Sequence, residues 1–264
     1  AVTTQELDEP YEVIVIDSGS RDGTLERCRV FGVRVLSIPP HSFGHGRTRN
    51  QGIAAAGGEL VALLVQDAVP ADSHWLAALV SALEGDPQAA GAYSRHLPQP
   101  GVGPIARYTT EFWYRHQGGR VVQRISDAAA YEALSLENKK LVCTFNDVSS
   151  IVRRSVWERI PFRDVTFAED LGWGYDVLCA GHTIIYEPAS KVYHSHERPL
   201  DYEFRRAYVE GRAVGELFGA PAELMSFRQA LRLMGLWRRV RARAEDTSGW
   251  EQLLEAMRPQ PRDR

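Results

Sequence analysis

Short apolar runs that end at a carboxylate are the clearest pattern in the chain. Residues 13–16 (Val-Ile-Val-Ile) and 60–65 (Leu-Val-Ala-Leu-Leu-Val) are short and have no helical periodicity, which favours strands buried on both faces. Asp17 ends the first run, and Asp67 follows the second. Each acid therefore stands where the backbone leaves the sheet. A third short strand is predicted at 33–37.

Helical segments alternate with these strands. Thr24 starts a helix that Gly32 closes, and a glycine-punctuated turn at 43–50 leads into a helix of small residues. The alternation of strand and helix implies parallel pairing with right-handed crossovers. In such sheets, ligands bind outside the carboxyl ends of the strands. Because two strands deliver acids, Asp17 and Asp67, to the same edge, we expect a ligand site there.

Asp67 has two interpretations. A carboxylate after a run of apolar residues is costly unless it meets water, a hydrogen-bond donor or a cation, and a divalent metal with a phosphorylated ligand would satisfy it. The alternative is a turn residue or a helix N-cap, since turn residues follow. Asp72 is the better cap, because it precedes a helical pattern that starts near Trp75. The spacing therefore favours a functional role for Asp67.

The second half of the chain alternates less regularly. The predicted elements are a strand at 89–93, a helix at 108–114, a strand at 141–145, a helix at 156–160, a helix from Glu169 to Gly181, and a strand pair at 183–186 and 191–193. Residues 117–140 are polar with weak periodicity, so we expect a loop that is mobile or faces an acceptor.

Two further groups of polar side chains are candidates for a functional site. Glu169 and Asp170 stand at the predicted start of a helix, where the dipole favours carboxylates; a plain capping pair is the alternative. His194 and His196 alternate, so on a strand both imidazoles would point the same way, as at a metal or phosphate site. A surface pair that makes only local hydrogen bonds is the alternative for the histidines.

Composition narrows the classes of protein. The 264 residues carry a formal net charge of -3, so no overall charge draws the chain to nucleic acid or to an anionic membrane. Cys28, Cys143 and Cys179 have no paired spacing and are interpreted as packing residues in a reducing compartment. No apolar segment approaches the roughly 18 residues that span a bilayer, and no signal peptide pattern precedes the first strand.

The C-terminal part is mostly helical from Leu200 onward. This predicts a core domain at 1–199 and a helical extension at 200–264. Arginines alternate with apolar residues between positions 228 and 243, with no acid among them, so this segment could lie on the surface of an anionic membrane. A helix docked on the core with a solvated basic face is the alternative. Residues 258–264 are expected to be disordered.

Four motifs together resemble one family. They are Val15-Ile-Asp17-Ser-Gly-Ser-Arg-Asp-Gly-Thr24, Gly46-Arg-Thr-Arg-Asn50, Gln66-Asp67-Ala68 with Pro70, and Glu169-Asp170. In order and spacing they resemble the family 2 glycosyltransferases of GT-A fold, over roughly residues 11–210. The Gln-Asp-Ala variant and the turn Phe43-Gly-His-Gly look most like the rhamnosyltransferase branch. The resemblance implies an α/β fold with a mixed, mainly parallel sheet flanked by helices, and a C-terminal helical extension.

The resemblance also implies a nucleotide-sugar site. The donor-binding residues that it implies are Asp17, Ser18, Gly19, Arg49, Asn50 and Gln66. Asp17 would accept a hydrogen bond from the imide N–H of a uracil or thymine ring. Arg49 and Asn50 would steady the nucleotide, because the planar fork of an arginine suits a diphosphate.

A metal ion is part of the implied site. Asp67 matches the last acid of the family's DxD motif and would hold Mg²⁺ or Mn²⁺ against the diphosphate. The sequence departs from the fuller motif, because Val65 stands where the first acid would be. Mg²⁺ often binds through one or two carboxylates plus substrate phosphates, and His194 would complete the ligand set.

The implied reaction is inverting sugar transfer. Asp170 matches the general base and Glu169 its companion; the base takes the proton of the acceptor hydroxyl while the metal offsets charge on the leaving group. The donor would be a deoxythymidine or uridine diphosphate sugar, with rhamnose as the sugar. The acceptor would be a cell-surface or lipid-linked glycan at the cytoplasmic face of the membrane. Position and polar or aromatic character place Trp113, Asn146 and Trp173 near this acceptor.

Two other functions are alternatives. The chain could be a non-catalytic nucleotide-sugar-binding or scaffold protein, or a nucleotidyltransferase on a similar fold. Metal-dependent donor hydrolysis separates the first from an enzyme, because water replaces the acceptor only in a competent site. The second lacks support, because no glycine-rich phosphate loop with a following Lys lies near the first strands.

The start of the chain departs from the resembled family. Its members open with an additional apolar strand and a helix before the strand that ends at Asp17, and here only the end of that helix, residues 1–5, would be present. Without that strand the central sheet would have an open interior position. We therefore expect residues 1–264 alone to be poorly soluble or inactive, and the upstream segment to rescue them. Normal nucleotide-sugar binding by the chain as given would contradict this.

Overall fold

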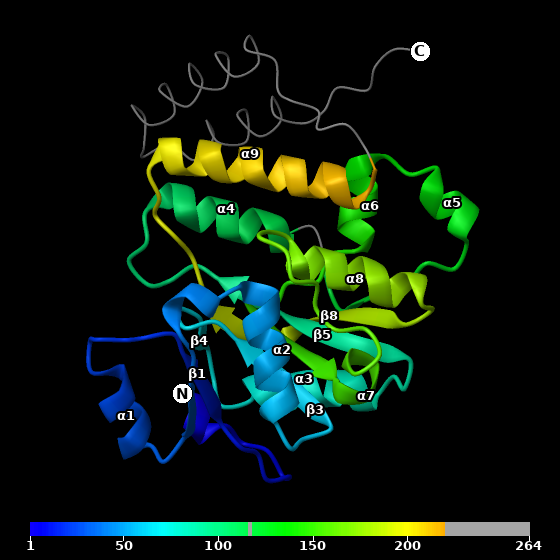
Figure 1. Ribbon diagram of the computed structural model, residues 1–264. Coiled ribbons are helices and arrows are strands. Elements are labelled where there is room, and N and C mark those ends of the chain that lie inside the picture. Colours follow the sequence, from blue (N-terminus) through cyan, green and yellow to red (C-terminus); the bar gives the residue numbers. More distant parts are fainter. Residues whose placement is uncertain (116–117, 220–264) are drawn as a thin grey trace. The chain divides into compact units, whose positions relative to one another are not determined.

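Helices cover both faces of a mixed β-sheet in the computed structural model, which describes residues 1–115 and 118–219 (Figure 1). The strands are β1 (Ile14–Asp17), β2 (Arg34–Ser37), β3 (Leu60–Leu64), β4 (Val69–Pro70), β5 (Ala89–Leu97), β6 (Val121–Gln123), β7 (Ser149–Arg153) and β8 (Thr183–Tyr193). The helices are α1 (Thr24–Val30), α2 (His45–Ala55), α3 (Trp75–Glu84), α4 (Pro104–Arg115), α5 (Ala128–Glu132), α6 (Leu136–Val142), α7 (Arg154–Trp157), α8 (Glu169–Cys179) and α9 (Leu200–Leu217). Two 3₁₀ turns lie at Val2–Thr4 and Pro40–Ser42.

The main sheet has the strand order β3-β7-β5-β8-β4, with β6 also paired to β8. β5 and β8 are parallel, and β7 runs antiparallel to both β3 and β5. The long strands β3, β5 and β8 therefore share one direction, with β7 reversed between β3 and β5. Their carboxyl ends meet at one edge of the sheet, where the polar side chains described below gather.

The core has one apolar cluster on each face of this sheet. On one face, α3 buries Leu79 and Leu83 against Ile151 of β7 and Ile185 of β8. On the opposite face, α8 buries Trp173 among the cluster that holds the alternate strand residues, such as Val152 and Ile184. This alternation follows from the two-residue period of a strand. It explains why the neighbouring residues Ile151 and Val152 of β7 are both apolar.

The helix α9 packs on the second of these clusters. Val214 is buried there, and Lys140 of α6 forms an ion pair with Glu210. The first residues of the predicted C-terminal extension thus contact the core, while the boundary at residue 200 stays a prediction. The arginine-rich segment 228–243 and the end at 258–264 lie outside the described residues. Among the described helices, none has the length and apolar character that crossing a bilayer requires.

The predicted elements up to residue 93 are confirmed except for the turn at 43–50. His45 begins α2, so Arg47, Arg49 and Asn50 are helical. Gly46 serves close packing rather than a turn: a Cβ atom there would lie 2.1 Å from the carbonyl oxygen of Arg163. A glycine at this place lets α2 approach the segment before α8.

Three predictions in the second half are wrong. Residues 117–140 were expected to form a loop, but they include β6, α5 and the start of α6. The expected strand at 141–145 is the end of α6 and an irregular segment, because burial of Cys143 and Phe145 does not require a strand. The expected strand pair at 183–193 is the single strand β8, which stays paired with β5 across an irregularity between Glu187 and Lys191.

The first two strands stand apart from the main sheet. β1 and β2 pair in parallel, as predicted, and form a separate two-stranded sheet. β3 was expected to continue this parallel order, but it pairs antiparallel with β7 and is the edge of the main sheet. All five residues of β3, Leu60–Leu64, are only partly buried. The expectation that residues 1–264 alone are poorly soluble or inactive stays a prediction.

The residues before β1 dock on the main domain. The Gln5 side chain is buried, its amide donates to the carbonyl of Asp72 at 3.0 Å, and its oxygen accepts from the backbone N–H of Leu76 at 3.1 Å. Gln5 therefore supplies a partner for an N–H in the first turn of α3, which would otherwise be unsatisfied.

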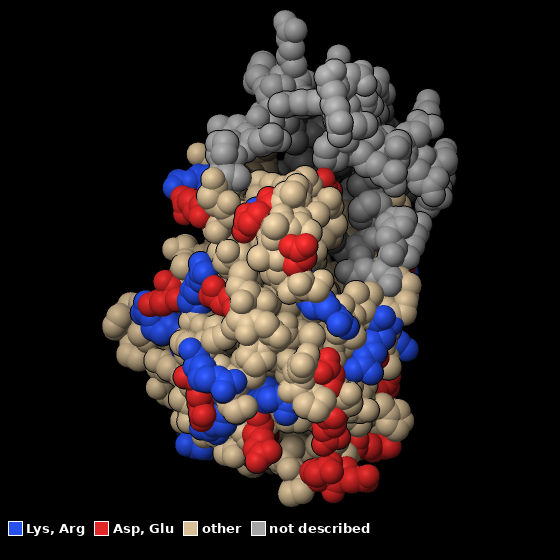
Figure 2. Space-filling view, turned by 90° about the vertical axis from the view of Figure 1, so that its right-hand side faces the viewer, with Lys and Arg blue, Asp and Glu red and all other residues tan. Residues whose placement is uncertain are grey.

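Charged side chains of both signs are spread over the surface. On the face in Figure 2, basic and acidic side chains of the described residues lie interspersed, in keeping with the formal net charge of -3. This face therefore offers no broad field of one sign such as nucleic-acid binding uses.

A closed chain of buried hydroxyl groups joins α3 to three strands. The indole N–H of Trp75 donates to Ser149 Oγ at 2.8 Å, and Ser94 Oγ lies 2.7 Å from both Ser149 Oγ and Ser190 Oγ. Ser190 Oγ donates to the carbonyl of Trp75 at 3.0 Å. These two ends fix the donor direction: Ser149 donates to Ser94, and Ser94 to Ser190. Each hydroxyl thus donates once and accepts once.

Replacement of Ser94 by Ala is expected to lower the free energy of unfolding by roughly 1–3 kcal/mol, because the buried Ser149 hydroxyl on β7 loses its acceptor and the buried Ser190 hydroxyl on β8 loses its donor. Urea denaturation followed by circular dichroism measures this. Ser81→Ala on the exposed side of α3 is the matched control and should stay within about 0.5 kcal/mol of the parent. Equal stability of both variants would show that the hydroxyl chain contributes nothing.

Candidate functional site

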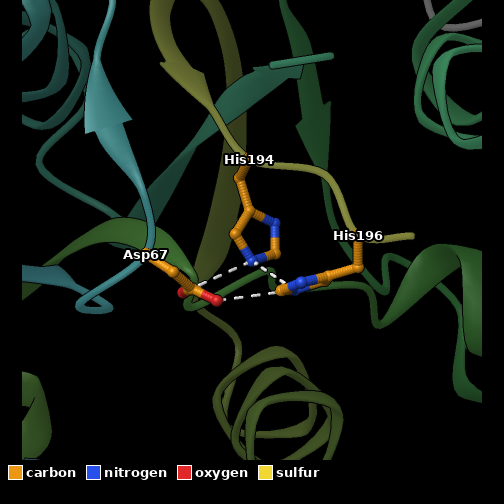
Figure 3. A group of neighbouring side chains, drawn as sticks. All are labelled: Asp67, His194 and His196. Carbon is orange, nitrogen blue, oxygen red and sulfur yellow. Dashed lines mark hydrogen bonds and ion pairs between the residues drawn. The ribbon is translucent and has the colours of Figure 1, made fainter. Parts of the chain in front are cut away.

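Three side chains with metal-binding atoms meet at the carboxyl end of the main sheet. Asp67 follows β3, and His194 and His196 follow β8 (Figure 3). The Nε2 atoms of both histidines lie 3.6 Å from Asp67 carboxylate oxygens and 3.0 Å from each other. The three donor atoms lie within 4.8 Å of one another, a spacing that could hold a metal ion. His194 and His196 come 127 and 129 positions after Asp67 in the sequence, and the fold brings the three side chains together.

The tails of β5 and β8 hold this cluster in place. The backbone N–H of His194 donates to the carbonyl of Leu97 at 2.9 Å, and Ser195 Oγ accepts from the N–H of Gln99 at 2.9 Å. The Gln99 side chain in turn donates to the Asp67 carbonyl at 3.3 Å. Asp67 and the histidine pair are therefore tied to one short segment after β5.

The histidines are kept neutral near pH 7. Burial lowers the pKa of His194 to about 4, although the Asp67 carboxylate partly opposes this. Burial and the nearby Arg198 lower the pKa of His196 as well. A neutral imidazole keeps a lone pair for a metal, so the residues present fit a divalent cation. The prediction that Asp67 and His194 lie together is met by the geometry, which adds His196; metal binding itself stays a prediction.

A second polar cluster centres on Arg49 of α2. Its Nε and Nη2 atoms each lie 2.8 Å from a carboxylate oxygen of Asp147, and its Nη1 donates to Glu169 Oε1 at 2.8 Å. The side chains of Arg49, Asp147 and Glu169 are 12%, 5% and 9% exposed. One buried guanidinium therefore joins α2, the loop before β7 and the N-terminus of α8.

Asp170 lies beside this cluster, in the first turn of α8 as predicted. Its Oδ1 accepts from the N–H of Leu171 at 2.7 Å. Burial, with the adjacent Glu169 carboxylate, raises the pKa of Asp170 from 3.8 to about 6, although Arg49 opposes the rise. Ala168, which precedes the acids, has a positive φ of 62°, an uncommon conformation for a residue with a Cβ. The turn thus holds strain next to the acids.

The acid at the end of β1 is enclosed by its own turn. Asp17 is buried, and its carboxylate accepts hydrogen bonds from the backbone N–H groups of Gly19 and Ser20 at 3.0–3.2 Å. Hydrogen bonds from the Ser20 side chain and from these N–H groups hold the pKa of Asp17 below its usual value. Gly19, with φ of 103°, provides the left-handed conformation of the turn. Ser18 lies between them and is partly exposed.

The predicted donor-binding side chains on α2 have protein partners in this structure. The Asn50 amide donates to the Phe162 carbonyl at 2.8 Å, and its oxygen accepts from Trp157 Nε1 at 2.8 Å and Phe162 N at 3.0 Å. Arg49 is engaged by two carboxylates as described. Asn50 therefore ties α2 to α7 and the segment before α8, and Arg49 ties it to the loop before β7 and the start of α8. Contact of either residue with a nucleotide stays a prediction. Gln66 is exposed beside Asp67.

The predicted acceptor residues have different surroundings. The expectation for Trp173 is wrong, because its side chain is fully buried, stacks on Phe162 and donates to the Ile160 carbonyl at 2.8 Å. Asn146 is partly exposed and donates to Tyr114 Oη at 3.3 Å, so its acceptor role stays a prediction. Trp113 lies on α4, but its side chain is outside the described part of the chain.

Asp147 was not among the sequence-based candidates, and His196 was a candidate only as the companion of His194. Asp147 follows the segment expected as a strand at 141–145 and received no role, and its partner Arg49 lies 98 positions earlier. His196 was seen as the companion of His194 but was not assigned to the metal. The signal for His196 was its spacing; no local pattern distinguishes Asp147 from an ordinary loop acid.

Comparison with known proteins identifies the family. The model of the family described as glycosyl transferase family 2 matches residues 1–157, more than half of the chain. The O-antigen chain rhamnosyltransferase WbaN of Salmonella anatum is 29% identical over 78% of this chain and 64% of its own length. RfbN of Salmonella typhimurium, with the same description, is 30% identical over 76% and 62%. The chain therefore spans less than two thirds of the length of these relatives.

Solved structures show the same fold. Glucosyl-3-phosphoglycerate synthase from Mycobacterium tuberculosis, in complex with Mn²⁺, UDP and glucosyl-3-phosphoglycerate, superposes with a TM-score of 0.56 at 20% identity, over 80% of this chain and 70% of that one. The expected α/β fold of GT-A type, with a mixed sheet flanked by helices, is thereby confirmed. The resemblance that the four motifs carried is confirmed as well, and the chain belongs to glycosyl transferase family 2.

Proposed function

We propose that this chain is an inverting glycosyltransferase that moves a sugar from a nucleoside diphosphate sugar to a hydroxyl of a glycan. The proposal rests on one observation: a chain of glycosyl transferase family 2 contains both the cluster around Asp170 and the cluster of Asp67, His194 and His196. Asp170 is a carboxylate with a raised pKa at a helix N-terminus, and Asp67 with His194 and His196 forms a three-donor group suited to a metal. The Asp170 carboxylate suits a general base, and a metal held by the Asp67 group would offset the charge of a diphosphate leaving group.

Asp170 is assigned the role of the base. It takes the proton of the acceptor hydroxyl as that oxygen forms a bond to the anomeric carbon of the sugar. The bond from this carbon to the diphosphate oxygen breaks on the opposite face, and its electron pair leaves with the nucleoside diphosphate. A bound divalent metal would offset the charge that develops on that leaving group. Glu169 is held by Arg49 and keeps the neighbouring acid in place.

The donor set of the metal group favours Mn²⁺ over Mg²⁺. Two imidazoles and one carboxylate are offered by the chain, whereas Mg²⁺ prefers oxygen ligands and suits imidazole poorly. The similar synthase from Mycobacterium tuberculosis is described with Mn²⁺ and UDP. His196 is proposed as the third protein ligand, with the diphosphate oxygens and water in the remaining positions.

Rhamnose is the proposed sugar, because the O-antigen chain rhamnosyltransferases of two Salmonella strains match most of this chain. The acceptor is then a hydroxyl of a growing surface glycan, carried on a lipid. Asp17, Ser18 and Gly19 are the proposed contacts for a uracil or thymine ring, and Gln66 for the donor beside Asp67. The proposed membrane contact falls on residues 228–243, outside the described part of the chain.

Donor hydrolysis tests the proposed function without a known acceptor. The chain is incubated with dTDP-rhamnose, UDP-glucose or GDP-mannose, with Mn²⁺, with Mg²⁺ or with EDTA, and release of nucleoside diphosphate is followed. We expect Mn²⁺-dependent release from dTDP-rhamnose. Release of pyrophosphate from a nucleoside triphosphate instead would favour a nucleotidyltransferase. A folded chain that releases nothing from any donor would contradict the proposed function.

The rate should depend on pH through Asp170. Its pKa of about 6 lies above the ordinary value of 3.8, so the base is ionised above pH 6 and protonated below it. We expect a plateau above about pH 7 and a fall of about tenfold per pH unit below pH 6, since only the carboxylate accepts a proton. Donor hydrolysis at saturating Mn²⁺ from pH 4.5 to 8 measures this profile. An acid limb near pH 4, as for an exposed aspartate, would contradict the raised pKa.

A further inference from the structure

We propose that Asp147 is a positioning residue of this site, which acts through Arg49 to fix Glu169 and Asp170 against the acceptor hydroxyl. The inference rests on the proposed function for the role of Asp170, but the contacts that carry it are independent of that role. It assigns a function to an acid that the mechanism above does not use.

The first argument is the geometry of the guanidinium. Asp147 engages the fork formed by Nε and Nη2 of Arg49, with both contacts at 2.8 Å. The Nη2 contact is a hydrogen bond to Oδ1 and the Nε contact is an ion pair with Oδ2, and two contacts on one edge orient the guanidinium more tightly than a single contact does. The remaining nitrogen, Nη1, then points at Glu169 Oε1, again at 2.8 Å. Asp147 thus determines where Arg49 presents its last donor.

The second argument is that the N-terminus of α8 lacks a side-chain cap of its own. Ala168 stands at the N-cap position, and its methyl group can accept no hydrogen bond. Its backbone is in the left-handed region, with φ of 62°. Contacts from elsewhere must therefore hold this turn, and Arg49 makes one to the first residue of the helix. Gly46, one turn earlier on α2, lets the two helices come close enough, because a Cβ there would lie 3.4 Å from that of Glu169.

The third argument is charge. One guanidinium acts on three carboxylates from two elements: it contacts Asp147 of the loop before β7 and Glu169 of α8, and its charge also acts on Asp170 of α8. Burial and the charge of Asp170 raise the pKa of Asp147, and Arg49 opposes this rise. Because Asp147 occupies the fork, Arg49 neutralises Asp170 only in part. Removal of the Asp147 charge would leave Arg49 free to turn toward Glu169 and Asp170, and Asp170 would become a weaker base.

The variant Asp147→Asn tests the proposal. Its side chain keeps the shape but offers a single acceptor oxygen, so the fork is lost. We expect the kcat of donor hydrolysis to fall about 10- to 100-fold, as for a misplaced catalytic group. The KM for the donor should stay within about threefold, and the acid limb of the pH profile should move to lower pH, since the base loses a nearby negative charge. A merely structural role would not move the pH limb.

Asp164→Asn is the matched control. Asp164 pairs with Arg47, two positions before Arg49 on α2, at 2.8 Å, but both side chains are about half exposed. This variant should leave kcat, KM and the pH limb unchanged. Arg49→Lys is the second test, in case Asp147→Asn does not fold: it keeps the charge but cannot form the fork, and the same loss of kcat is expected. If Asp147→Asn and Arg49→Lys both behave like Asp164→Asn in an active enzyme, the proposal is overturned.

A stability measurement separates this proposal from the proposed function. Asp147→Asn, Glu169→Gln and the double variant are compared by thermal denaturation of the full chain, which needs no activity. If both acids share Arg49, the shift in Tm of the double variant differs from the sum of the single shifts. Coupling in a chain that hydrolyses no donor would support the Arg49 arrangement and refute the function. Additive shifts would overturn the positioning role whatever the activity.

Discussion

Replacement of Asp170 by Asn is expected to lower the rate of donor hydrolysis and of sugar transfer by about 10²- to 10⁴-fold, the usual contribution of a general base. Asparagine keeps the size of the side chain but cannot accept the proton. Affinity for the donor should be nearly unchanged, because the proposed donor contacts lie elsewhere. Initial rates and calorimetric binding of dTDP or UDP with Mn²⁺ measure the two quantities. A variant that keeps substantial activity would remove Asp170 from this role.

The same variant should be more stable than the parent at pH 7. The folded-state pKa of Asp170 is raised from 3.8 to about 6, so the folded protein binds this proton more tightly than the unfolded chain. The contribution of Asp170 to stability is therefore fully present below pH 3.8 and is lost as the pH rises through 6. An asparagine at position 170 does not ionise, so the variant does not lose this stability as the pH rises. We expect a higher Tm than the parent at pH 7 and little difference near pH 4; a lower Tm at pH 7 would contradict the raised pKa.

Asp176→Asn is the control for both measurements. Asp176 lies on the same helix α8 and pairs with Arg163 through two contacts, at 2.6 and 2.8 Å. Its loss should leave the acid limb of the rate profile in place. It should not raise the Tm at pH 7, because this carboxylate is paired rather than held beside another acid.

The second large effect is expected at the metal group. Asp67→Ala should lower Mn²⁺-dependent turnover by about 10²- to 10⁴-fold, because a bound metal supplies several kcal/mol of charge stabilisation in the transition state. The fold should tolerate the change, since the Asp67 side chain is 45% exposed. EDTA should abolish the parent activity, and excess Mn²⁺ should restore it. Manganese affinity is measured by calorimetry or by electron paramagnetic resonance.

Histidine variants show which imidazoles bind the metal. His194→Ala and His196→Ala should each weaken Mn²⁺ binding, whereas His74→Ala, an exposed histidine 3.7 Å from Glu6, should not. If His196→Ala binds Mn²⁺ like the parent, the third ligand is wrong and the set reduces to Asp67 and His194. Full activity of Asp67→Ala in EDTA would exclude a metal-dependent reaction.

The sequence by itself determined the elements that local pattern encodes. Apolar runs that stop at Asp17 and before Asp67 predicted β1 and β3, and the acids before an apolar face predicted the start of α8, because strand and helix periods are written in neighbouring residues. The motifs that follow these elements carried the resemblance to the family. The alternate spacing of His194 and His196 predicted two imidazoles on one side, and both lie near Asp67.

Only the tertiary structure decided how distant residues share partners. Arg49 is 98 positions from Asp147 and 120 from Glu169, so no local pattern reveals that one guanidinium joins them. Trp173 was expected near the acceptor from its position and aromatic character, yet its side chain is fully buried. β3 was expected inside a parallel sheet, but its place at the edge beside β7 depends on pairing across the chain. Burial and ion pairing are properties of the assembled core, and their free energies depend on neighbours that sequence order does not specify.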